Sequence, residues 1–166
     1  MTARKPAHVR MLSCLAICTA LLPAWAGAAV SCTASSTSTA FGIYNPLSAT
    51  PTFANGTVQV TCTLLSGGST TVNLVSSYST GASGTYATRK MLSGANVLNY
   101  NLYFDAAYTS VRGNGTGGSA TGGATLNLTP TNPTGTASGT IYGRIPAGQD
   151  VAAGSYTDTI VVTITY

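Results

Sequence analysis

The sequence contains very little charge and almost no histidine. Only 6% of its 166 residues are Asp, Glu, Lys or Arg, there is no glutamate, and the single histidine and single tryptophan are His8 and Trp25. A chain without histidine beyond position 28 cannot support a Ser-His-Asp or Cys-His mechanism there. Three scattered aspartates also provide a poor ligand set for a metal ion. We therefore predict no catalytic activity, no cofactor and no metal site.

The basic residues are equally sparse, and three of the seven, Arg4, Lys5 and Arg10, lie in the first ten positions. From position 29 onward four basic and three acidic residues leave a net charge of +1. Nucleic-acid binding needs a stripe of cations, so we predict no nucleic-acid partner. With 44% hydrophobic residues, the chain has the composition of a folded domain rather than a disordered one.

Residues 1–28 have the pattern of a secretory signal peptide. A basic segment (MTARKPAHVR) precedes an apolar run (MLSCLAICTALL), and residues 24–26 and 26–28 are both A-x-A cleavage patterns. The apolar run is shorter than the roughly 20 residues that span a bilayer. We predict cleavage after Ala28, export through the inner membrane, and one mature domain over 29–166. An uncleaved membrane anchor and a lipoprotein modified at Cys32 are the alternatives.

Two cysteines, Cys32 and Cys62, remain after this cleavage removes Cys14 and Cys18. An even pair in an exported chain indicates one disulfide formed in an oxidising compartment, with two buried free thiols as the alternative. Closing a loop of about 30 residues would stabilise the fold by roughly 3–4 kcal/mol.

The hydrophobic pattern of the mature chain is that of short β-strands. Residues 57–64 alternate strictly, which places Val58, Val60, Cys62 and Leu64 on one face. Shorter apolar alternations occur at 72–74, 98–104 and 141–145, a further short strand is possible at 124–128, and turn signals occur at 55–56, 66–68, 81–84, 146–148 and 153–154. This spacing predicts an all-β fold, specifically an Ig-like β-sandwich.

The C-terminal run, residues 156–166, is the clearest predicted strand. Its apolar face consists of Ile160, Val162, Ile164 and Tyr166, and Val161 is out of phase. Edge strands are usually protected by charge or proline, and neither follows Asp158 here. We therefore expect this strand to accept a strand from another chain.

Three stretches resemble the spore coat protein U domain family, whose relatives include subunits of archaic (sigma-class) chaperone–usher pili. They are residues 41–46 (FGIYNP), residues 89–91 with 98–105 (RKM and LNYNLYFD), and residues 141–146 with 154–166 (YGRIP within IYGRIP, then GSYTDTIVVTITY). Together with the two cysteines they cover almost all of the mature chain.

The resemblance implies an Ig-like sandwich that lacks its last strand and is completed by a strand from another polypeptide. The expected partners are a periplasmic chaperone, an outer-membrane usher and other pilus subunits. The implied groove wall is Ile160, Val162 and Ile164, with Tyr166 at its end and its carboxylate held by the chaperone. The implied function is that of a structural subunit of a fibre or coat at the cell surface, which supports adhesion and biofilm formation.

One feature departs from the pilin pattern. A donor extension of about ten alternating residues should precede the first cysteine, yet only residues 29–31 separate the predicted cleavage site from Cys32. The chain is therefore expected to accept a strand without donating one. A tip-proximal or minor subunit explains this best. A non-polymerising secreted or spore-coat protein, or a cleavage site further upstream, would also explain it.

A carbohydrate-binding β-sandwich is the main alternative from a different functional class. Tyr78, Tyr86 and Tyr108 lie near predicted loops and could stack on sugar rings, although ordinary strand and turn tyrosines are favoured. Residues 89–90 (RK) are expected to lie on a solvated strand edge.

Overall fold

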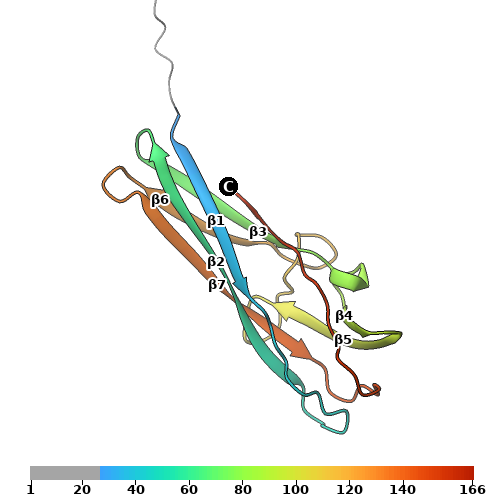
Figure 1. Cartoon of the computed structure of the whole chain (residues 1–166). Coiled ribbons are helices and arrows are strands. Elements are labelled where there is room, and N and C mark those ends of the chain that lie inside the picture. Colours follow the sequence, from blue (N-terminus) through green and yellow to red (C-terminus); the bar gives the residue numbers. More distant parts are fainter. Residues whose placement is uncertain (1–26) are drawn as a thin grey trace, which may run out of the picture.

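The computed structural model describes residues 27–166, so the predicted signal peptide lies almost entirely outside the described residues. Figure 1 shows an elongated all-β domain with one short 3-10 turn, η1, at Gly81–Ser83. The strands are β1 (Ala29–Thr37), β2 (Thr52–Ser66), β3 (Thr70–Tyr78), β4 (Arg89–Ser93), β5 (Asn96–Tyr103), β6 (Gly122–Leu128), β7 (Thr134–Ile145) and β8 (Val162–Thr165). No helix within this part of the chain is long and apolar enough to span a membrane.

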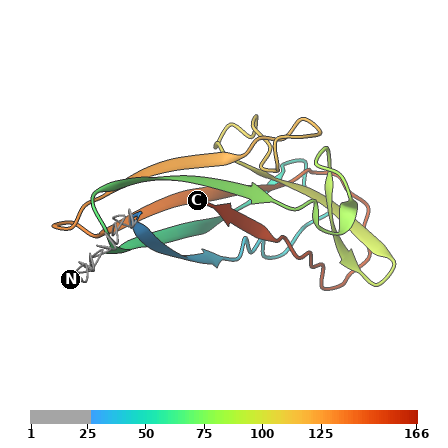
Figure 2. The ribbon, with the colours of Figure 1, turned by 90° about the horizontal axis from the view of Figure 1, so that it is seen from above.

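The strands form two sheets that face each other as a sandwich (Figure 2). One sheet has the order β1-β2-β7-β5-β4 and the other has the order β6-β3-β8, and every ladder is antiparallel. The predicted all-β, Ig-like sandwich is confirmed. β1 is an edge strand of the larger sheet and β8 is an edge strand of the smaller one, and the two lie on the same side of the sandwich because their residues line one cleft.

The alternation along β2 positions the core as predicted. Val58, Val60, Cys62 and Leu64 are all buried, with at most 8% of any of these residues exposed. They pack in two adjoining clusters with inward residues of β3, β5 and β7, including Leu74, Leu102 and Ile141. Each sheet therefore presents one apolar face to the other, as sheet-on-sheet packing requires.

Two arginines are buried in this core, which the sequence analysis did not anticipate. Arg89, expected on a solvated edge, has no exposed surface, whereas its neighbour Lys90 is exposed as predicted. The Arg89 guanidinium donates hydrogen bonds to the carbonyl oxygens of Ser79 and Arg112 and to Oδ1 of Asn101, at 2.6–3.2 Å. Its burial is tolerated because these oxygens replace water. Burial lowers the pKa of both Arg89 and Arg112.

The starts of β2 and β7 differ from the sequence prediction, because small residues there gave no strand signal. The predicted turn at 55–56 is wrong, since β2 continues straight through it. Gly56 sits in this strand because a Cβ there would lie only 2.9 Å from the carbonyl oxygen of Thr37. Conversely, β7 begins at Thr134 rather than near Ile141, because its first half (TGTASGT) has no large apolar residue to reveal an alternation.

The C-terminal strand is shorter than predicted. Regular pairing covers only β8, Val162–Thr165, rather than all of 156–166. Residues before it are held by isolated contacts: the backbone of Thr157 exchanges hydrogen bonds of 2.8 and 3.1 Å with Leu92, and the Val161 carbonyl oxygen accepts one of 2.9 Å from the Ser79 N–H.

Candidate functional site: an open groove between β1 and β8

The first wall of the site is β1, the edge strand that carries the disulfide. Cys32 and Cys62 face each other across the β1–β2 ladder and are bonded, which confirms the predicted disulfide. β1 pairs with β2 alone, so its other edge has no strand partner among the described residues. The disulfide is thus a covalent link that keeps this edge strand attached to its sheet.

The second wall is β8, which is also paired along one edge only. It contacts β3 through four residue pairs, from Val75–Thr165 to Tyr78–Val162. Ile160, Val162 and Ile164 face the core yet remain half-buried, while Val161 on the opposite face is 61% exposed. The predicted phase of this segment is therefore correct. Three inward aliphatic side chains that are only half covered lack part of the packing that a complete sandwich would provide.

Tyr166, predicted to end the groove wall, lies past the end of β8. It is 59% exposed and lines none of the clefts described below.

The backbone of β8 also leaves hydrogen-bonding groups free on the open side. The N–H and C=O of Val161 both point toward Ser79, on the β3 side. Because successive residues of a strand point their amides to opposite sides, those of Val162 and Ile164 point toward the open edge. This edge therefore offers the pattern of donors and acceptors to which an added strand binds.

A continuous groove starts between these two walls and extends past the end of β1 and the start of β8. Its upper part, about 230 Å³, lies between residues 34–36 of β1 and the inward side chains of Ile160, Val162 and Ile164. The middle part, about 550 Å³, shares Ser36, Ile160 and Val162 with it. The lower part, about 910 Å³, shares Phe41 and Tyr156 with the middle. We call this feature the strand groove.

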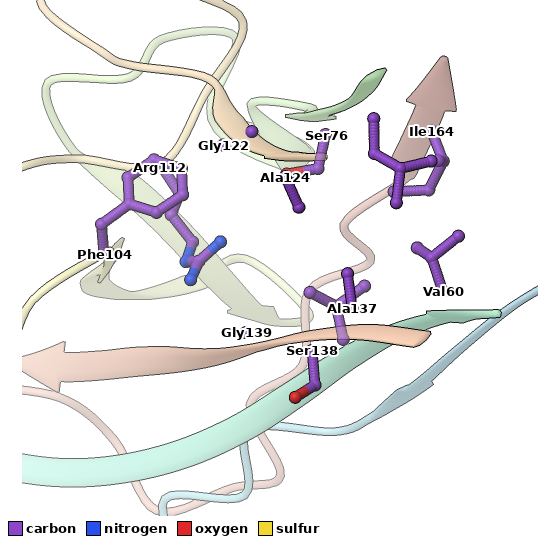
Figure 3. A pocket seen from close by; sticks show the side chains of 13 residues that line it. Val60, Ser76, Phe104, Arg112, Gly122, Ala124, Ala137, Ser138, Gly139 and Ile164 are labelled. Atoms are coloured by element: carbon purple, nitrogen blue, oxygen red, sulfur yellow. The ribbon is translucent and has the colours of Figure 1, made fainter. Parts of the chain in front are cut away.

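The strand groove opens into an underfilled region of the core. A cavity of about 170 Å³ shares Val58 and Ile164 with the upper groove. In Figure 3, Ile164 and Val60 enter this space from opposite sheets, and Ala124 and Ala137 line it. Small side chains at a position where two sheets meet leave space for a side chain from outside the chain.

One polar contact fixes the middle of the groove. The Tyr100 hydroxyl donates a 2.7 Å hydrogen bond to Asp158, whose other carboxylate oxygen accepts one of 2.9 Å from the Ala82 N–H. Burial, and then this hydrogen bond, raises the pKa of Tyr100, so the phenol stays protonated as the donor. The contact anchors the segment before β8 without filling the groove.

The chemistry of the groove is that of a binding surface. Its walls supply apolar side chains and strand edges, and within residues 27–166 no group of three or more His, Cys, Asp or Glu could hold a metal ion. Two members of the predicted tyrosine platform are unavailable to a ligand, because Tyr78 and Tyr86 are buried.

Comparison with known proteins identifies the family of this chain. The family model described as Spore Coat Protein U domain matches residues 18–163. The chain belongs to this family. It is similar to Protein U of Myxococcus xanthus, with 33% identity over 133 residues, which cover 76% of this chain and 70% of that protein.

The fold of this spore coat protein U domain also occurs in a pilus assembly complex. It is similar to a chain in the crystal structure of the CsuC–CsuE chaperone–tip adhesion subunit pre-assembly complex from archaic chaperone–usher Csu pili of Acinetobacter baumannii. The TM-score is 0.51 at 16% identity, over 83% of this chain and 40% of that chain. The domain thus spans less than half of that chain, and the likeness is one of fold. The predicted resemblance to the spore coat protein U domain family is confirmed.

Proposed function

We propose that this domain is an exported structural subunit of a surface fibre or coat, and that a strand from another polypeptide completes its sandwich. The observation that carries the proposal is the strand groove, where two unpaired strand edges face each other across half-covered aliphatic side chains. An inserted strand would satisfy both the free amides of β8 and the apolar side chains, which is the physics of β-augmentation.

The partners follow from this mechanism. In the periplasm a chaperone supplies the strand first, and a neighbouring subunit supplies it after assembly at an outer-membrane usher. The similarity to a chain of a chaperone–subunit complex supports the chaperone and subunit partners. Assembly at the surface would then serve adhesion and biofilm formation.

The position in the assembly follows from where β1 begins. The sequence left only residues 29–31 as a possible donor extension. Ala29 is already paired with Ser66, so these three residues belong to β1 itself. A chain cleaved after Ala28 has no free segment to donate. We infer a subunit that accepts a strand at the end of a fibre, or in a coat, and N-terminal sequencing of the exported protein tests this. A mature start near residue 15 would contradict it.

The decisive experiment is periplasmic expression of the full chain with and without its cognate chaperone. We expect a 1:1 complex to co-purify, and we expect the chain made alone to be degraded or to aggregate. A stable monomer that ignores the chaperone would contradict the proposal.

A further inference from the structure

A second surface lies on the outer face of the larger sheet, away from the strand groove. Phe53 of β2 faces Arg144 of β7, and Tyr103 of β5 faces Tyr142 of β7, so the four side chains occupy one face at the junction of three strands. Tyr108, from the turn after β5, adds a fifth side chain. We call these five residues the aromatic patch. None of them lines the groove or the cavity beside it.

The rings of the patch are held in a fixed arrangement. Tyr108 stacks on Phe53 with ring centroids 4.8 Å apart and meets Tyr103 edge-on at 5.5 Å. Its backbone has φ +58°, the one positive φ of a non-glycine residue within 27–166. Asp105 holds this turn by accepting hydrogen bonds from the N–H groups of Thr109 and Ser110. An unfavourable backbone conformation is thus maintained where it places a ring on the surface. Phe53 is still 50% exposed.

Arg144 is the cation of the patch, and its Nε has no acceptor within the described chain. Its Cζ lies 5.9 Å from the centre of the Tyr108 ring. Its Nε is the single buried side-chain nitrogen or oxygen in the described part of the chain that has no hydrogen-bond partner. Arg89 and Arg112, by contrast, donate to several oxygens. A guanidinium without a partner beside exposed rings is suited to an incoming carboxylate.

The surface beyond the patch is neutral and rich in hydroxyl groups. Along β2 and β7 the outward residues continue mostly as Thr and Ser, together with Asn55 and Gln59. The cross-strand pairs include Thr57–Thr140 and Thr61–Thr136, and the hydroxyls of the latter pair are 3.1 Å apart. Such a face can hydrogen-bond a chain of sugars. It cannot neutralise a nucleic acid, because it contributes a single cation.

We propose that the aromatic patch binds an acidic polysaccharide. The rings would cover the apolar face of a sugar, Arg144 would pair with the carboxylate of a uronic acid, and the hydroxyl rows of β2 and β7 would contact the neighbouring sugars. This assigns the ligand to a face that stays free when the groove is occupied, so a subunit already in a fibre or coat could bind a matrix. The site uses Tyr108 from the predicted tyrosine platform and does not involve Tyr78 or Tyr86.

The test measures binding of the exported full chain, with any partner that co-purifies, to polygalacturonate and to its methyl ester. The two polymers share a sugar backbone and differ in whether the carboxylate is free. We expect the free acid to bind more tightly. Arg144→Gln should weaken binding of the acid at least tenfold and remove the preference over the ester, and Phe53→Ala should weaken binding of both polymers.

Matched controls separate this site from general effects. Lys90→Gln removes an exposed cation elsewhere, and Leu65→Ala removes an exposed apolar side chain at the far end of β2. Both should bind like the wild type. The proposal is overturned if neither polymer binds, if Arg144→Gln binds like the wild type, or if Lys90→Gln weakens binding equally. None of these results would bear on the strand groove, which chaperone capture tests separately.

Discussion

Replacing Val162 with aspartate places a carboxylate in the wall of the strand groove. In the free chain this side chain is half-buried, so the aspartate reaches water and the isolated domain should fold much as the wild type does. When a strand is inserted, position 162 becomes covered, and the carboxylate must then be buried without a partner or take up a proton. The cost therefore falls on binding rather than on folding.

The free-energy cost of burying this carboxylate on binding is limited by the cost of protonating it. Bringing a carboxyl group with a pKa of about 3.9 to its neutral form at pH 7 costs about 4 kcal/mol, which limits the penalty for the charge and corresponds to roughly a thousandfold loss of affinity. At pH 5 the same step costs about 1.5 kcal/mol, so the loss should shrink to roughly tenfold. We expect Val162→Asp to abolish co-purification with the chaperone at neutral pH and to recover much of it at pH 5. Ile164→Asp should behave in the same way.

The matched control is one residue away. Val161 is 61% exposed on the opposite face, so Val161→Asp introduces the same charge into the same segment without entering the groove. Co-expression of each variant with the chaperone should give capture of Val161→Asp at a yield close to that of the wild type. Equal losses for both variants, or capture of Val162→Asp at wild-type yield at pH 7, would refute the reasoning.

Three further outcomes are expected from the described structure. Cys62→Ser removes the link between β1 and β2 and should lower the melting temperature by roughly 10–15 °C under oxidising conditions; an unchanged melting curve would show that the disulfide does not hold the edge strand. Arg89→Ala leaves buried oxygens without donors and should lower the free energy of unfolding by about 3 kcal/mol or more, whereas Lys90→Ala should change it by less than about 0.5 kcal/mol. Urea unfolding measures both values, and equally small changes for the two variants would show that Arg89 is dispensable. Hydrogen bonds from the backbone, first that of Ser110, lower the pKa of Asp105 in the folded chain. The contribution of Asp105 to stability is therefore complete above its unfolded pKa of about 4 and is lost as the pH falls through the folded pKa. The stability difference between the wild type and Asp105→Asn should shrink on acidification, and a difference that grew would contradict this prediction.

Most of the fold was predicted from large apolar side chains at alternating positions. Residues 57–64 predicted a strand, its inward face and the position of Cys62, because Val and Leu at every second position have one arrangement that buries them. The same logic gave the correct phase for Ile160, Val162 and Ile164. The alternation could not predict the length of β8. Regular pairing in β8 depends on how far its partner β3 extends, and no strand pairs with the other edge of β8 in the described chain.

The features that were missed depend on tertiary contacts rather than on local pattern. Apart from Val30 and Cys32, β1 and the first half of β7 are built from Ser, Thr, Ala and Gly, which show no hydrophobic period. The burial of Arg89 depends on carbonyl oxygens of Ser79 and Arg112, distant in sequence. The aromatic patch likewise joins β2, β5, β7 and a turn, and no motif within any one of them indicates it.

The proposed strand exchange depends on the open edge of β8, and amide hydrogen exchange at Val162 and Ile164 measures that edge directly. In the chain released from its partners, these two amides should exchange far faster than those in β2, and binding of the chaperone should slow them strongly. If both amides were already protected in the isolated monomer, to the same degree as the core strands, the groove would be closed by the chain itself and the proposed strand exchange would have no site.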